Sequence, residues 1–546
     1  MPRGRAPTVA GDVDGPATPT YDGTMASPEP APGDGPANLS AGSPPRPRPA
    51  LLAAIVGIAL LGAGLLAWSI ATYGPAMGQT GLNNIAAAES LRHGEPLVTS
   101  RSDLFTLWPP LMPLLYAAGR ELGLSYAAAT AALNVAACFA LLLAVGLLTR
   151  QLGGGFLAVV VAEGSLSASP KLYLALANAR TEPLFLALLM LGAAAIVRYS
   201  AARRTRWLAV AGGCFALAAL QRYVGVAWIL VTAAALLLPT ARGVALRRRL
   251  LAAAGFAFGA LLPLCGWALR NLLLAGELSG ERPAADASLA TNAADAADTL
   301  ATWLAPTRGP HGLRWVVMGA VALVLVLGLV RLLRVAPSLR DRWALSYAIL
   351  LPTSYAVFLI LYASTVHLDP LGHRLLLPAF PPFCVLLGLA VDSCLRERRR
   401  LVRLAGAAAL LGAIVVSATA AAETRELALR SRSQGLGGLG AREWRESPLV
   451  AALLRAPLEG AVYSNLPELV LYYRDIRAGF LKPSRLKRDL RRSELMDRPG
   501  TIVWVANDGI PAMWASGPPH IVLRAEFPDG AIYDTTPPEP AGSETK

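Results

Sequence analysis

Apolar runs of about twenty residues recur along most of the chain, separated by shorter polar stretches. A run of this length can cross roughly 30 Å of hydrocarbon as a single helix. The pattern therefore predicts an all-α polytopic membrane protein with about eleven transmembrane helices. We expect these helices at about 51–72, 125–148, 154–172, 182–198, 207–220, 223–239, 250–269, 315–333, 343–364, 374–393 and 402–421.

A further apolar stretch, L-F-T-L-W-P-P-L-M-P-L-L-Y-A-A-G, begins at Leu104. It is short, and its prolines would interrupt a spanning helix. We predict a re-entrant or interfacial helix there instead of a full span.

The two ends of the chain lack such runs. Residues 1–49 are rich in Pro, Gly, Ala and Asp, so we expect a disordered tail, with no cleavable signal peptide before the first apolar run near Ala50. Residues 50–421 would form the multi-span domain. We predict a small α/β domain for residues 422–546, from the strand-like runs A-V-Y-S-N at 461, T-I-V-W-V-A at 501 and H-I-V-L-R-A-E-F at 520, the last followed by the turn signal P-D-G.

Composition supports a membrane protein, because only 16% of the residues are charged, against about a quarter in soluble proteins. The net charge of +14 is mostly arginine, and no nucleic-acid-binding motif accompanies it. Arginines precede the first predicted span and cluster after the even-numbered ones. The positive-inside rule then places the N-terminus in the cytoplasm and the C-terminal domain outside a plasma membrane. The arginines are Arg46, Arg48, Arg150, Arg198, Arg203, Arg204, Arg206, Arg242, Arg247, Arg248, Arg249, Arg331, Arg334, Arg340, Arg342, Arg396, Arg398, Arg399, Arg400 and Arg403.

Metal and cofactor chemistry is not indicated. The five cysteines lie within or at the ends of apolar segments and are expected to be small buried hydrophobes. CxxC, HExxH and Walker signatures do not occur. His367 and His373 flank Asp369, but a fourth ligand is not in view, so we predict neither a metal site nor a cofactor.

Charged residues gather at the predicted outer ends of several spans. Any one of them could be an interfacial anchor. Ionisable groups near hydrocarbon are costly, however, so four groups on one face favour a functional site. The groups are Arg180 with Glu182, Arg222 with Tyr223, Arg270 with Asn271 and Arg282, and Asp369 with Arg374.

Such a site suits a phosphorylated ligand. The guanidinium fork matches phosphate oxygens, and a carboxylate beside it can act as a general base or orient a hydroxyl. A lipid-linked phosphosugar fits this chemistry, and so does a transported anionic solute.

Short motifs occur in a fixed order between about residues 51 and 480: N-N-I-A-A-A-E-S-L-R-H-G, L-W-P-P-L-M-P-L-L-Y-A, T-E-P-L-F, Q-R-Y-V-G, R-N-L-L-L-A-G-E-L-S-G-E-R, H-L-D-P-L-G-H-R-L-L-L-P and V-Y-S-N-L-P-E-L-V-L-Y-Y. In this order the chain resembles the polyprenol-phosphate-sugar-dependent membrane glycosyltransferases of the GT-C fold. The closer resemblance is to the clan of protein O-mannosyltransferases and the lipid A aminoarabinose transferase.

The resemblance implies that a sugar moves from a polyprenyl-phosphate donor to an acceptor (glycan, lipid or protein) on the outer face, with inversion at the anomeric carbon. Arginines would stabilise the leaving phosphate, and a carboxylate would deprotonate or orient the acceptor. The candidates are Asp103, Glu89, Asp369 and Glu182 for catalysis, Arg222, Arg282, Arg374 and Arg270 for the donor phosphate, and Asn83, Asn84, Tyr223 and His367 for the substrate.

The chain departs from the family pattern in the first outer loop. Many members of the family that this chain resembles carry an acidic residue in the first outer loop, at a position that falls near Thr80 here, in G-Q-T-G-L-N-N-I. Either one of the four candidate acids is the base, or the chain is an inactive scaffold on the same fold. The third hypothesis is a transporter or flippase of a lipid-linked or anionic solute, although the sequence shows no inverted repeat.

Overall fold

The computed structural model describes residues 49–239, 244–280, 282–304, 311–482, 499–505 and 521–535. The N-terminal tail predicted to be disordered lies outside these residues, apart from Pro49.

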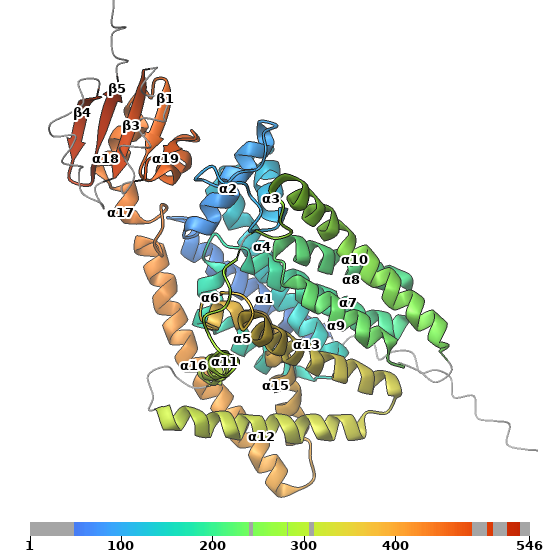
Figure 1. Cartoon of the computed structure of the whole chain (residues 1–546). Helices are drawn as coiled ribbons and strands as arrows, with labels where there is room; N and C mark the ends of the chain where they lie inside the picture. Colours follow the sequence, from blue (N-terminus) through green and yellow to red (C-terminus); the bar gives the residue numbers. More distant parts are fainter. Residues whose placement is uncertain are drawn as a thin grey trace, which may run out of the picture. The chain divides into compact units, whose positions relative to one another are not determined.

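Eight helices of the described chain are long and apolar enough to cross a membrane, so the chain is a multi-pass membrane protein (Figure 1). One of them is a continuous run of three shorter elements, α14, the 3-10 turn η1 and α15. The long helices are α1 (Pro49–Ile70), α4 (Tyr126–Gln151), α7 (Glu182–Ala202), α10 (Leu246–Ala275), α12 (His311–Val335), α13 (Leu339–Ala363), the run α14 (His373–Leu376), η1 (Leu377–Ala379) and α15 (Phe380–Leu395), and α16 (Arg400–Gln434).

The three remaining predicted spans are also helical but shorter. The span predicted at 154–172 is divided into two helices, because Ser169 caps the second one by accepting a hydrogen bond from the Leu172 amide, and Pro170 follows it. All eleven predicted segments are therefore helices, and eight reach spanning length. The shorter ones are α5 (Phe156–Ser167), α6 (Pro170–Leu176), α8 (Thr205–Gln221) and α9 (Gly225–Leu237).

The centre of the bundle is formed by α7 and α15, the most deeply buried of the long helices. Helix α7 packs against α4 and α8, and α15 packs against α5 and α12. Small residues permit this close approach, as is usual between helices in membranes. A Cβ atom at Gly388 of α15, for example, would overlap the carbonyl oxygen of Ala158 in α5.

The cysteine prediction is correct for three residues and wrong for one. All five cysteines are free; Cys138, Cys384 and Cys394 are buried, and Cys214 is half-buried. Cys265 is exposed, because it lies on a face of α10 that no other described helix covers.

Shorter helices lie outside the long ones. The Pro-rich stretch after Leu104 contains α3, which supports the prediction of a short helix there, and α3 packs against α2. Helix α11 packs against α12 and α13. These helices are α2 (Gln79–Arg92), α3 (Leu111–Glu121), α11 (Leu289–Leu304), α17 (Arg442–Arg445), α18 (Pro448–Arg455) and α19 (Pro467–Arg474).

The C-terminal region forms a mixed five-stranded sheet in the order β2-β1-β3-β5-β4. Strand β1 is parallel to β2 and β3, whereas β5 is antiparallel to β3 and β4. The runs predicted at 461, 501 and 520 correspond to β1, β3 and β4, and the P-D-G turn joins β4 to β5. The strands are β1 (Ala461–Ser464), β2 (Gly479–Phe480), β3 (Gly500–Val505), β4 (Ile521–Phe527) and β5 (Gly530–Thr535).

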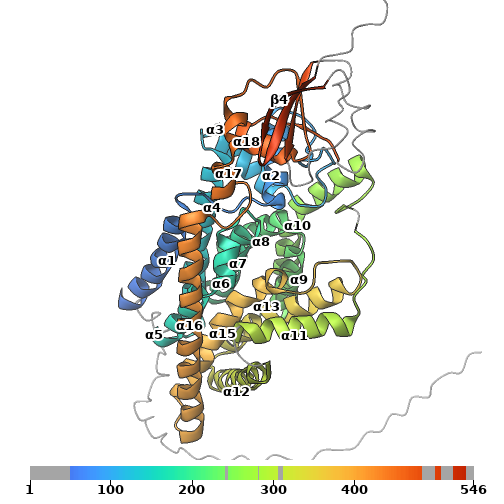
Figure 2. The same cartoon turned by 90° about the vertical axis from the view of Figure 1, so that its left-hand side faces the viewer.

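The sheet lies at the end of the bundle that carries α2 and α3 (Figures 1 and 2). Helix α16 leads from the bundle to this region. Side chains link the two parts directly. Gln79 of α2 donates to the Glu468 carboxylate of α19 at 2.8 Å.

Candidate functional site

A cavity of about 480 Å³ lies where loops from five parts of the chain meet. We call it the arginine cavity, because three guanidinium groups contribute to its wall. Its other walls are mainly aromatic and aliphatic. The lining residues are Thr80, Leu107, Trp108, Pro109, Thr181, Gln221, Arg222, Tyr223, Val224, Arg282, Tyr355, Phe358, Leu359, Tyr362, His367, Leu368, Asp369, Arg374 and Leu375.

Two of these arginines share one buried carboxylate. Glu182 opens α7 and is completely buried. Its Oε1 atom lies 2.6 Å from Arg222 Nη1 and 2.8 Å from Arg374 Nε. Arg222 is the residue that follows the end of α8, in an extended backbone conformation. Arg374 lies on the short helix α14. The carboxylate therefore fixes two guanidinium groups that come from distant parts of the sequence.

The positive charge at this point exceeds the negative charge. Burial lowers the pKa of the nearby Arg180 guanidinium, and the charges of Arg374 and Arg222 lower it further, although Glu182 opposes this effect. One buried carboxylate thus faces three arginines. An added anion would reduce their mutual repulsion.

Asp369 is the one carboxylate among the described residues that line the arginine cavity. Its side chain is 77% exposed, and its Oδ2 atom lies 3.6 Å from Arg374 Nη1. The residues just before it are held by a second loop: the His367 amide donates to the Pro283 carbonyl at 2.9 Å, and His367 Nδ1 lies 3.1 Å from Asp286 Oδ1. This pairing brings the loop of Arg282 beside the loop of Asp369.

Tyr223 and Arg270 hold the Pro-rich loop that forms one wall. The Tyr223 hydroxyl donates to the Thr106 carbonyl at 2.7 Å and accepts a hydrogen bond from Trp267 Nε1 at 2.9 Å. Arg270 donates to the Phe105 carbonyl at 3.1 Å and is not among the lining residues. Of these two predicted residues, therefore, only Tyr223 reaches the arginine cavity.

The predicted residues of the first loop lie elsewhere, with the exception of Thr80. Glu89 is buried within α2, where it pairs with Arg92 at 3.0 Å and accepts a hydrogen bond from the Tyr126 hydroxyl. Asp103 is exposed and does not line the cavity. Asn84 donates to the Thr80 carbonyl at 2.9 Å, so it supports the residue that does line it.

Asn83 belongs to a polar network that the sequence did not reveal. Ser100 Oγ lies 2.7 Å from Asn83 Oδ1 and 2.9 Å from Glu468 Oε1, and Gln79 Nε2 lies within hydrogen-bonding distance of all three side chains. Glu468 is completely buried. Its position in the motif V-Y-S-N-L-P-E-L could have indicated Glu468 as a candidate. Its partner Gln79 could not be identified in this way, because it is 389 residues away in the sequence.

No group of three or more His, Cys, Asp or Glu side chains that could hold a metal ion occurs among the residues the structure describes. His367 lines the cavity and contacts Asp286, whereas His373 is part of α14.

Comparison with known proteins identifies the architecture. No protein-family model and no curated protein matches the sequence. ArnT from Cupriavidus metallidurans, in a crystal structure with undecaprenyl phosphate, superposes with a TM-score of 0.57 at 14% identity, covering 90% of this chain and 98% of ArnT. The oligosaccharyltransferase of Archaeoglobus fulgidus, in a complex with Zn and sulfate, gives a TM-score of 0.52 at 13% identity, covering 83% of this chain and 68% of that one. The chain has the GT-C glycosyltransferase fold.

The arginine cavity is thus a feature of a GT-C fold. At these identities the likeness identifies the fold alone.

Proposed function

We propose that this protein is an integral membrane glycosyltransferase that moves a sugar from a polyprenyl-phosphate donor to an acceptor. The observation that carries the proposal is the placement of Arg222, Arg282 and Arg374 in one cavity with Asp369, on a GT-C fold. The comparison with ArnT supports the donor class, because that structure contains undecaprenyl phosphate.

The arginines would bind the phosphate of the donor. Transfer breaks the bond between the anomeric carbon and the phosphate oxygen, and the phosphate leaves with increased negative charge. Guanidinium groups that are already fixed in position stabilise that charge without further reorganisation. The buried Glu182 carboxylate holds Arg222 and Arg374 in position.

Asp369 is the residue we assign to the acceptor. It would take the proton of the acceptor hydroxyl or amine while that atom attacks the anomeric carbon from the face opposite the leaving phosphate. This displacement inverts the anomeric configuration. The exposure of Asp369 suits a group that meets an acceptor arriving from water. Asp103 and Glu89 do not line the cavity, which makes them weaker candidates.

We also propose that the arginine cavity opens on the extracytoplasmic side of the plasma membrane, with the N-terminus in the cytoplasm. The support is the arginine pattern in the sequence, which follows the positive-inside rule.

Membranes carrying the protein, supplied with radiolabelled polyprenyl-phosphate sugars, provide the test. We expect protein-dependent loss of label from the lipid phase for one sugar, and loss of that activity in Arg374→Ala. Arg340→Ala is the matched control, because Arg340 is exposed, pairs with Asp341 and does not line the cavity. Equal activity of Arg374→Ala and the control would contradict the assignment.

The inactive scaffold is the second candidate, because Thr80 lines the cavity and lies near the first-loop position that is acidic in many members of the family that this chain resembles. If Asp369 is the base, Thr80→Asp should not increase transfer, since its charge would repel the donor phosphate. Transfer that appears only in Thr80→Asp would favour the scaffold. Solute movement without a covalent product would favour the transporter.

A further inference from the structure

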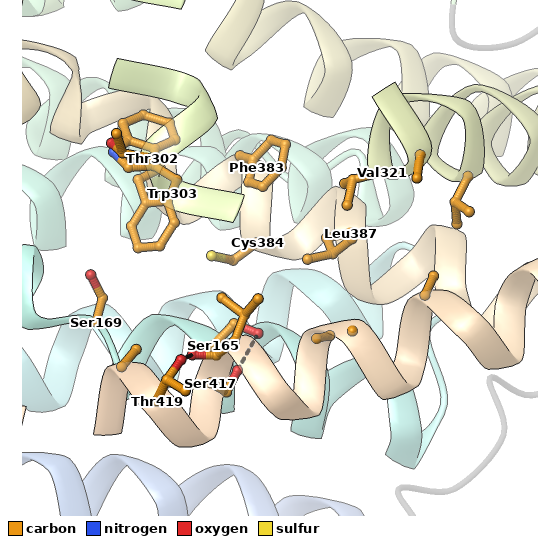
Figure 3. Close-up of a pocket in the computed structure, with 18 of the residues that line it drawn as sticks. Ser165, Ser169, Thr302, Trp303, Val321, Phe383, Cys384, Leu387, Ser417 and Thr419 are labelled. Atoms are coloured by element: carbon orange, nitrogen blue, oxygen red, sulfur yellow. Dashed lines mark hydrogen bonds between the residues drawn. The ribbon is translucent and has the colours of Figure 1, made fainter. Parts of the chain in front are cut away.

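A second cavity, of about 400 Å³, lies between α5, α6, α11, α12, α15 and α16 (Figure 3). It shares no lining residue with the arginine cavity. Phe383 and Leu387 of α15 and Val321 of α12 line it, with α16 on the opposite side. A volume of this size is in the range of small-molecule sites.

The cavity forms because α16 contributes small side chains opposite the larger side chains of α12 and α15. A Cβ atom at Gly412 would meet no atom within 4 Å, so the space beside this helix is open. The small residues recur at the three- and four-residue spacing of one helix face. They are Ala405, Ala408, Ala409, Gly412, Ala413, Ser417 and Ala420.

The charged side chains that line the cavity lie at one end. Lys171, Ser169 and Glu423 line that end, where Thr424 of α16 donates to the Ala168 carbonyl at 2.7 Å. From Glu423 to Ala405 the lining extends along α16 for roughly 27 Å at the helical rise, close to the thickness of the hydrocarbon core. The charged end suits the headgroup of a lipid, and the long apolar slot suits one of its chains.

The two charges at the polar end point to one class of headgroup. Neither Lys171 nor Glu423 forms an ion pair with another described side chain. A phosphate would be attracted to the Lys171 ammonium, and an amine to the Glu423 carboxylate. A polyprenyl phosphate has no amine to balance Glu423, so the charges do not favour the donor lipid here.

We propose that the second cavity binds an aminophospholipid of the membrane, with one chain along α16, the phosphate at Lys171 and the amine at Glu423. The polar end lies beside α14, because α6, which begins next to Lys171, packs against that helix. Helix α14 also carries Arg374. The bound lipid would therefore support one wall of the arginine cavity from outside. This proposal does not depend on the proposed transfer activity.

Photocrosslinking tests the proposal with the full-length protein in detergent. The probe is phosphatidylethanolamine with a diazirine on one chain. We expect crosslinks in α15 and α16, and at least a fivefold loss of labelling in Gly412→Leu, whose side chain would fill the slot. Gly255→Leu is the matched control, because Gly255 is also open to its surroundings, lies on α10 and does not line the cavity.

Two further probes separate the lipid classes. Phosphatidylglycerol carrying the same diazirine should label less than the phosphatidylethanolamine probe, and Glu423→Gln should remove the difference. Equal labelling of Gly412→Leu and Gly255→Leu would overturn the proposal. It would also be overturned if polyprenyl phosphate displaced the probe better than unlabelled phosphatidylethanolamine does. If Gly412→Leu fails to fold, the headgroup comparison in Glu423→Gln still decides the matter.

Discussion

Arg374 Nε lies 2.8 Å from Glu182 Oε1, although 192 residues separate them in the sequence. The same oxygen pairs with Arg222 at 2.6 Å. One oxygen of Glu182 therefore contacts two cations, and we propose that Glu182 is a positioning residue and not the base. The proposals for the arginine cavity depend on this shared carboxylate.

Glu182→Gln should destabilise the fold and reduce transfer. The substitution keeps the size of the side chain but leaves Arg222 buried without its countercharge, at a cost of about 3 kcal/mol. Misplaced guanidinium groups should lower transfer by about 100-fold. Thermal unfolding in detergent and the transfer assay measure the two effects. Glu446→Gln is the control, since that exposed pair with Arg442 contributes little to stability. Unchanged transfer in Glu182→Gln would argue against the positioning role.

Arg282→Ala should separate donor binding from folding. Within the described part of the chain, Arg282 makes one long hydrogen bond, 3.5 Å to the Leu107 carbonyl, so its loss should change stability by less than about 1 kcal/mol. Loss of its contact with the phosphate should weaken donor binding by about 10- to 100-fold. Arg282→Lys should restore part of this, because it keeps the charge but not the guanidinium fork. The Kd for polyprenyl phosphate is the measurement. Donor binding as tight as in the unaltered protein would remove Arg282 from the phosphate site.

Asp369→Asn should lower kcat by about 10²- to 10⁴-fold while the donor KM changes little. The amide keeps the shape of the side chain but cannot accept the acceptor proton. Steady-state kinetics with a defined donor would measure both constants. Asp103→Asn should keep most of the activity, because Asp103 does not line the cavity. A larger loss in Asp103→Asn than in Asp369→Asn would reverse the assignment of the base.

Gln79→Ala should weaken the link between α2 and the C-terminal sheet region. The buried Glu468 carboxylate would lose its 2.8 Å hydrogen bond from Gln79, which costs about 1–3 kcal/mol. The midpoint of thermal unfolding should fall accordingly. Gln434→Ala is the matched control, because Gln434 is exposed at the end of α16. If both variants unfold at the same temperature, the network around Glu468 does not stabilise the fold.

Some of the arginine cavity could be anticipated from the sequence. Arg222, Arg282, Arg374 and Asp369 stand at helix ends beside long apolar segments, and charge at that position is costly enough to be informative. Asp103 and Glu89 were also candidates because they are charged residues of the first outer loop. In the structure, however, Glu89 is paired within α2 and Asp103 faces solvent.

The apolar helices of this protein could be predicted from the sequence, because apolar length and prolines act locally and each such segment can be recognised without its neighbours. The strands at 461, 501 and 520 could also be predicted, through their short-range pattern. Which charged and polar groups lie in contact could not be predicted in this way. The pairs Glu182–Arg374 and Gln79–Glu468 join residues that are far apart in the chain, and no local pattern specifies a partner at such a separation. Helix packing brings them together, and that packing depends on the fit of many small apolar surfaces at once.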